Sequence, residues 1–115
     1  MTHQELVRLL AKPGRDICDT MSPSMMHNLH MAVGICGEAG ELIDAIKKAA
    51  VYNKPLDREN VIEELGDLEF YMEGLRQQLS ISREETLTNN VSKLLKRYED
   101  GKYSDRAAQD RADKV

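Results

Sequence analysis

The sequence contains very few aromatic residues: it has no tryptophan and a single phenylalanine among its 115 residues. Aromatic and β-branched side chains are enriched in strands, so this scarcity favours a helical core built from aliphatic side chains and methionine. No segment alternates between apolar and polar residues over the length of a strand. Both absences argue against an all-β protein, and we predict an all-α domain.

Membrane, secreted and nucleic-acid-binding proteins have sequence signals that are also missing here. No apolar run approaches the ~20 residues of a transmembrane helix, and the N-terminus lacks the charged and apolar regions of a signal peptide. Cys18 and Cys36 have no metal-ligand spacing, which favours buried free thiols in a reducing compartment. The net charge of −4 offers no basic surface for nucleic acid. We therefore expect a cytoplasmic protein with no membrane or nucleic-acid partner.

Between its proline and glycine breaks, the chain follows the period of amphipathic helices. Ser22-Pro23 is a typical helix start, and Asp57 and Ser82 are N-cap candidates further along the chain. We expect a bundle of about four helices in one domain at 1–101, followed by a polar tail at 102–115. The predicted helices cover about residues 4–11, 23–50, 58–79 and 83–100.

Two acidic pairs fall at helical spacing: Glu38 with Glu41, and Glu64 with Asp67. Residues three apart share a helix face, so each pair presents two carboxylates side by side. If the two helices lie antiparallel, four carboxylates converge, and their mutual repulsion favours a divalent cation between them. Such oxygen ligands suit Mg²⁺, with Mn²⁺ as a substitute. One pair alone is commonly a solvated surface feature, whereas two pairs together predict a metal site.

The helix expected at 23–50 has two different faces on a helical wheel. Glu38 and Glu41 share one face with histidines and small residues. Gly34 and Gly37 would clear space on this acidic face, whereas Gly40 falls near the apolar side and would serve close helix packing. The opposite face is an apolar stripe of Met25, Leu29, Ala32, Val33, Cys36, Ile43, Ile46 and Ala50.

Further polar residues lie on the flanks of the other two long helices. Glu64 lies beside the leucine stripe of its helix, whereas Glu63 points away from it, so we choose Glu64 as the inward residue. Lys93 and Arg97 form an i, i+4 basic pair on the last helix, which is suited to phosphate groups. A pocket with both an acidic cluster and a basic pair suits a metal–polyphosphate complex. Taken alone, each of these residues is also compatible with an ordinary solvent-exposed charge.

The sequence resembles the MazG-type all-α nucleoside triphosphate pyrophosphohydrolases of the single-domain type. The resemblance rests on HNLHMAVGICGEAGELIDAIKK, on EELGDLEFYMEGL further along, and on NNVSKLLKRYEDGKYS near the end. The family pattern is ExxE, a spacer and ExxD. Here Glu38, Glu41, Glu64 and Asp67 fill its four places, with 22 residues between Glu41 and Glu64. The resemblance implies that these four acids are the catalytic metal ligands.

The resemblance also implies Mg²⁺-dependent hydrolysis of a nucleoside or deoxynucleoside triphosphate to the monophosphate and pyrophosphate, in a house-cleaning role on the nucleotide pool. It leaves open whether water attacks the α- or the β-phosphorus, and whether Glu63 or Asp44 assists as the base. Family members assemble as homodimers or homotetramers, and a helix with two faces agrees with such pairing. The residues expected to contact substrate are Lys93, Arg97, Asn90, His27, His30 and Tyr71.

Two other hypotheses compete with the enzyme. A non-catalytic helical interaction or regulatory module would carry the same acidic pairs as surface residues and would bind no metal through them. A di-iron carboxylate bundle would need Glu-x-x-His on two helices, whereas His27 and His30 precede the acids here. Metal binding that depends on Glu41 and Asp67 would separate the enzyme from the interaction module.

Overall fold

The computed structural model describes residues 1–111 and 113, and this part of the chain forms six α-helices and no strand. The all-α class predicted from the sequence is therefore confirmed. The helices are α1 (His3–Leu10), α2 (Gly14–Thr20), α3 (Pro23–Tyr52), α4 (Arg58–Leu79), α5 (Arg83–Arg97) and α6 (Asp105–Asp110).

The long helices begin at the side-chain caps that the sequence provides. Ser22 Oγ accepts a hydrogen bond from the Met25 N–H at 3.0 Å, and Pro23 occupies the first turn of α3. Asp57 caps α4 and Ser82 caps α5 in the same manner. The boundaries of these three helices are thus set largely by local chemistry, and the prediction places all three starts correctly.

Two of the three short helices, α2 and α6, are absent from the prediction, and α5 ends earlier than predicted. Pro13 directly precedes α2, so the break that ends α1 also begins a helix. Ser104 Oγ accepts from the Ala107 N–H at 3.1 Å and caps α6, within the segment expected to be only a polar tail. α5 ends at Arg97, and Gly101 has a φ of +72° in the turn that leads to α6. Helices of six or seven residues are too short to show a long amphipathic period, so the sequence pattern does not reveal α2 and α6.

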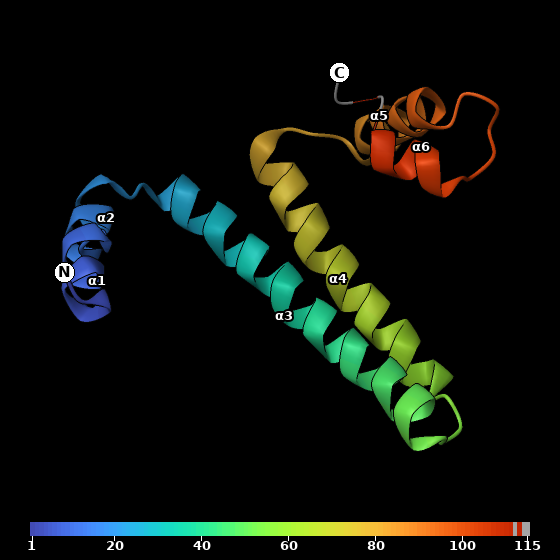
Figure 1. The fold of residues 1–115 in the computed structure, drawn as a ribbon, viewed down its shortest axis with the longest axis horizontal. Helices are drawn as coiled ribbons and strands as arrows, with labels where there is room; N and C mark the ends of the chain where they lie inside the picture. The colour runs from blue at the N-terminus through green and yellow to red at the C-terminus, as the bar shows by residue number, and fades with distance from the viewer. Residues whose placement is uncertain (112, 114–115) are drawn as a thin grey trace.

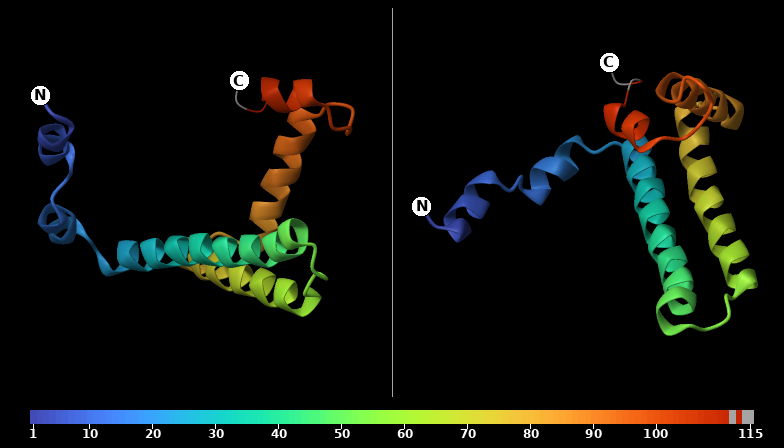
Figure 2. Two further views of the ribbon diagram at one scale, coloured as in Figure 1. Left: turned by 60° about the horizontal axis from the view of Figure 1, so that its bottom comes forward. Right: turned by 45° about the vertical axis from the view of Figure 1, so that its right-hand side comes forward.

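α3 and α4 form an antiparallel hairpin, the one pair of helices in the described chain that packs along its length (Figure 1). α1 and α2 extend from the start of α3, and α5 and α6 form a separate unit after α4 (Figure 2). The Cα radius of gyration is 19.7 Å, whereas a compact chain of this length has about 13 Å. One chain therefore does not close the four-helix bundle by itself.

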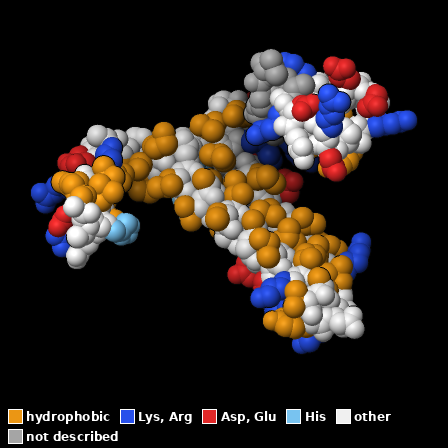
Figure 3. Space-filling view, viewed as in Figure 1, with side chains coloured by type: hydrophobic (Ala, Val, Ile, Leu, Met, Phe, Trp, Pro, Cys, Tyr) orange, Lys and Arg blue, Asp and Glu red, His pale blue; other side chains and the backbone are white. Residues whose placement is uncertain are grey.

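α3 packs against α4 through its acidic, small-residue face. The buried hydrophobic side chains are Met31 and Ala45, each 6% exposed. By contrast, Val33 and Ile43 of the apolar stripe are 60% and 66% exposed, and apolar side chains are visible along both helices of the hairpin (Figure 3). The two faces of α3 are present, but the apolar stripe is not the core of the single chain.

The glycines of α3 differ in what surrounds them. A Cβ atom added at Gly34 would collide with the ring of Tyr71 on α4, so only glycine allows this close approach. Gly37 and Gly40 would meet no atom within 4 Å. The predicted role of Gly40 in close helix packing therefore has no counterpart within one chain.

We expect alanine substitutions at Gly34 and Gly37 to change stability in opposite directions. Gly34→Ala should destabilise the protein by about 1–3 kcal/mol, because the added methyl group displaces the Tyr71 ring. Gly37→Ala should stabilise it by up to ~1 kcal/mol, because alanine is the better helix former in open space. Urea unfolding of the two variants measures the difference. Equal shifts of the two midpoints would contradict the packing of Tyr71 on Gly34.

Candidate metal centre

A cluster of three carboxylates lies on the inner face of the α3–α4 hairpin. Glu38 from α3 and Glu64 and Asp67 from α4 each place one oxygen within 4.8 Å of the others. Glu64 is 9% exposed, whereas its neighbour Glu63 is exposed, as the helical wheel predicts. Because Glu64 and Asp67 are three residues apart, one face of α4 presents both to α3. This arrangement matches the oxygen-ligand chemistry of hard divalent cations.

Glu64 is the electrostatically most perturbed member of the carboxylate cluster. Its pKa is raised from 4.5 to about 7, first by a hydrogen bond with the Glu38 carboxyl, then by burial and by the charges of Glu38, Asp67 and Glu41. Its Oε2 atom is buried and has no hydrogen-bond partner among the described residues. No lysine or arginine in the described chain pairs with the three carboxylates. An unpaired buried acceptor among like charges fits a cation ligand.

The raised pKa of Glu64 predicts how stability and metal binding depend on pH. Between about pH 4.5 and 7 the folded protein holds a proton that the unfolded chain has lost, so this contribution to stability is full below about pH 4.5 and is lost as the pH rises through about 7. A cation needs the ionised carboxylate, so its binding releases this proton and its affinity rises with pH. Without metal, the melting temperature should be higher at about pH 5.5 than at about pH 8.

Thermal unfolding at these two pH values, with and without MgCl₂, measures both effects. We expect added Mg²⁺ to raise the melting temperature more at the higher pH. The variant Glu64→Gln cannot titrate at this position and should lose most of the pH dependence. The same dependence in Glu64→Gln as in the wild type would show that another group is responsible.

The fourth predicted ligand, Glu41, is exposed and lies outside the cluster of three. Its charge nevertheless contributes to the raised pKa of Glu64, so it lies near enough to interact with the cluster. Of the two candidate bases, Asp44 forms a surface ion pair with Lys48 at 3.0 Å, and Glu63 is exposed. The structure thus brings three of the four predicted ligands together and leaves Glu41 at the edge.

Three of the predicted substrate contacts lie on the same inner face of the hairpin. Tyr71 is one helical turn from Asp67 on α4. The ring centroids of His30 and Tyr71 are 6.2 Å apart in an edge-to-face arrangement. The Nε2 atom of His27 lies 3.4 Å from the carbonyl oxygen of Gly74. These side chains therefore form an aromatic extension of the inner face next to the carboxylates.

The predicted phosphate contacts Asn90, Lys93 and Arg97 lie on α5, which does not pack along α3 or α4 in the described chain. Within one chain, the structure does not bring these residues to the carboxylate cluster. Arg97 instead donates from Nε to Oδ1 of Asp113 at 2.8 Å. No periodic pattern marks Asp113, or Asn28, whose Oδ1 atom is buried without a partner among the described residues.

The described residues thus form an all-α protein with a cluster of three carboxylates between two antiparallel helices. A family model, the MazG nucleotide pyrophosphohydrolase domain, matches residues 26–101. The match covers more than half of the chain, and the chain belongs to this family. Membership implies nucleotide pyrophosphohydrolase activity, which in this family is typically metal-dependent.

Two further comparisons, with curated proteins and with solved structures, found no match. None of the helices in the described chain has both the length and the hydropathy needed to cross a membrane.

Proposed function

We propose that this protein is a Mg²⁺-dependent pyrophosphohydrolase that converts a nucleoside or deoxynucleoside triphosphate to the monophosphate and pyrophosphate. The observation that carries the proposal is the convergence of Glu38, Glu64 and Asp67, with a buried unpaired oxygen on Glu64. Family membership supports the reaction class. A role in clearing unwanted nucleotides from the cellular pool fits this reaction.

In this proposal Glu38, Glu64 and Asp67 hold the cation, and Glu41 completes the ligand set from the edge. When bound, Mg²⁺ or its substitute Mn²⁺ polarises phosphoryl oxygens and lowers the pKa of water. Glu64 contributes a negative oxygen only after losing the proton that its neighbours' charges help it to retain. The crowding of the carboxylates therefore couples deprotonation of Glu64 to arrival of the cation.

The aromatic extension of the inner face would contact the nucleoside. Tyr71 lies one turn from Asp67, so a nucleotide whose phosphates reach the carboxylates could place its base or sugar near the Tyr71 ring. His30 and His27 offer ring nitrogens as hydrogen-bonding groups on the opposite helix. On α5, lysine and arginine would offset the remaining phosphate charge. The residues assigned to the phosphate groups are Asn90, Lys93 and Arg97.

We also propose that the protein works as a homodimer or homotetramer. The accessible surface of the chain is 9488 Å², whereas a compact monomer of this size exposes about 6,300 Å². The excess of about 3,000 Å² per chain amounts to about 6,000 Å² for a pair, which lies at the upper end of the total area that obligate homodimers bury. Leu42, Ile43 and Ile46 line an apolar hollow on α3 that a second chain could fill. The α5 helix of that second chain would then supply the phosphate contacts that one chain keeps apart from its carboxylates.

A panel of nucleoside triphosphates tests the proposal. Each triphosphate is incubated with the protein and Mg²⁺, and pyrophosphate and orthophosphate are measured separately. Pyrophosphate together with the monophosphate is the expected result. Orthophosphate alone would indicate a phosphatase and contradict the proposal, and no product from any triphosphate would favour the interaction module.

A further inference from the structure

Asp113 buries its carboxylate against Arg97 of α5. Asp113 accepts a hydrogen bond from Arg97 at 2.8 Å, and the two side chains are 5% and 16% exposed. This hydrogen bond, followed by the charges of Arg97 and Lys93, holds the pKa of Asp113 below its usual range. Asp113 is therefore ionised at neutral pH, and it interacts with both of the cations assigned to phosphate.

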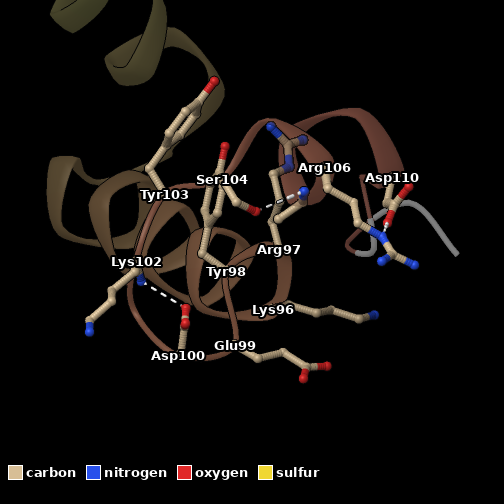
Figure 4. A pocket seen from close by; sticks show the side chains of 11 residues that line it. Lys96, Arg97, Tyr98, Glu99, Asp100, Lys102, Tyr103, Ser104, Arg106 and Asp110 are labelled. Carbon is tan, nitrogen blue, oxygen red and sulfur yellow. Dashed lines mark hydrogen bonds and ion pairs between the residues drawn. The ribbon is translucent and has the colours of Figure 1, made fainter.

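The ion pair with Asp113 engages one of the N–H groups of the Arg97 guanidinium. The guanidinium group carries five N–H donors in a planar fork, and Asp113 takes the one on Nε. The two terminal nitrogens form no hydrogen bond with Asp113. Arg97 also lines a surface cavity of about 420 Å³ at the junction of α5 and α6, together with Lys96 and Arg106 (Figure 4).

The local charge also favours a supporting role for Asp113 over a blocking one. Lys93 and Lys96 line a second hollow with Asp113, and Arg97 adds a third cation beside it. Around Asp113, three cations therefore face one carboxylate. The cavity beside Arg97 has a smaller positive balance, because four basic residues line it with the acids Glu99, Asp100 and Asp110. A carboxylate that mimicked phosphate would be expected on the terminal nitrogens, where planar bidentate recognition takes place.

We infer that Asp113 is a positioning residue: it fixes the Arg97 guanidinium through Nε so that the terminal nitrogens can bind the pyrophosphate portion of the substrate. The inference rests on the proposed function, which assigns Arg97 to phosphate. A free arginine side chain loses rotamer entropy when it binds an anion, and a guanidinium already held in place loses less. Groups that hydrogen-bond to a metal ligand and orient it change metal affinity or activity by about 10–100-fold. Asp113 orients an arginine in the same manner, and we expect an effect at the lower end of that range.

Calorimetric titration of inorganic pyrophosphate into the Mg²⁺-loaded protein tests the inference. Asp113→Ala should weaken binding by about 10-fold, and Asp113→Asn, which keeps an acceptor oxygen for Nε, should recover part of the loss. Asp19→Ala is the control of equal charge, because Asp19 is an exposed carboxylate on α2 that forms no ion pair among the described residues and lies outside both hollows. This control should bind pyrophosphate as the wild type does.

A double-mutant cycle distinguishes positioning from a general effect on the fold. Lysine has no Nε donor of the guanidinium type, so Asp113→Ala should have no further effect in an Arg97→Lys background. If Asp113→Ala binds pyrophosphate as well as or better than the wild type, the inference is overturned while the proposed function stands. If the wild type neither hydrolyses triphosphates nor binds pyrophosphate, the proposed function fails and the inference fails with it.

Discussion

Glu64→Gln is expected to abolish hydrolysis and at the same time to stabilise the metal-free protein at high pH. Hydrolysis should fall by at least ~100-fold, because the substitution removes a metal ligand and even the outer partners of such ligands change activity by 10–100-fold. Stability should rise, because glutamine removes one charge from the cluster and its amide can donate to Glu38. The measurements are kcat/KM for the preferred triphosphate and the melting temperature without metal at about pH 8.

Glu63→Gln provides the matched control for this prediction. Glu63 is the adjacent acid on α4 and is exposed, so its substitution changes the net charge equally without touching the cluster. It should leave both kcat/KM and the melting temperature near the wild-type values. Hydrolysis at the wild-type rate by Glu64→Gln would exclude the carboxylate cluster from catalysis.

Ile43→Glu is expected to dissociate the oligomer and to lower activity with it. Ile43 is 66% exposed in the single chain, so the substitution should leave the α3–α4 hairpin intact. In an apolar interface, however, an unpaired carboxylate is costly to bury, and we expect association to weaken at least ~100-fold. Activity should fall because α5 of a second chain would no longer reach the carboxylates. Light scattering after size-exclusion chromatography over a concentration series measures the mass.

The control for the oligomer prediction is Ile43→Val, which keeps the position apolar and should preserve the wild-type mass. Circular dichroism would establish that Ile43→Glu remains helical. A fully active monomeric wild type would contradict the role assigned to the second chain. An Ile43→Glu variant with the wild-type mass would place the interface elsewhere on the surface.

The features that the sequence predicts well are those set by local chemistry. Ser22, Asp57 and Ser82 mark helix starts because a side-chain oxygen caps backbone N–H groups only a few residues away. The choice of Glu64 over Glu63 follows from helix periodicity alone, and the burial of the two residues agrees with it. For the same reason, the short spacing of Glu64 and Asp67 was enough to predict that both face α3.

The features that the sequence does not predict depend on distant parts of the chain or on another chain. Periodicity assigns two faces to α3, and the acidic face meets α4, as the expected convergence of the carboxylates requires. Periodicity does not show what the larger apolar stripe contacts, and in one chain this stripe stays exposed. Close approach at Gly34 permits the acidic face to pack instead. A turn and helix α6 separate Asp113 from Arg97 in the sequence, so no local sequence pattern predicts their ion pair.

The central claim is that the inner face of the α3–α4 hairpin binds a catalytic divalent cation. Calorimetric titration of Mg²⁺, and of Mn²⁺ in parallel, into the wild type and Asp67→Ala tests it most directly. The account predicts saturable binding to the wild type with release of a proton near pH 7, weaker binding to Glu41→Ala and no binding to Asp67→Ala. Identical titrations of the wild type and Asp67→Ala would contradict it.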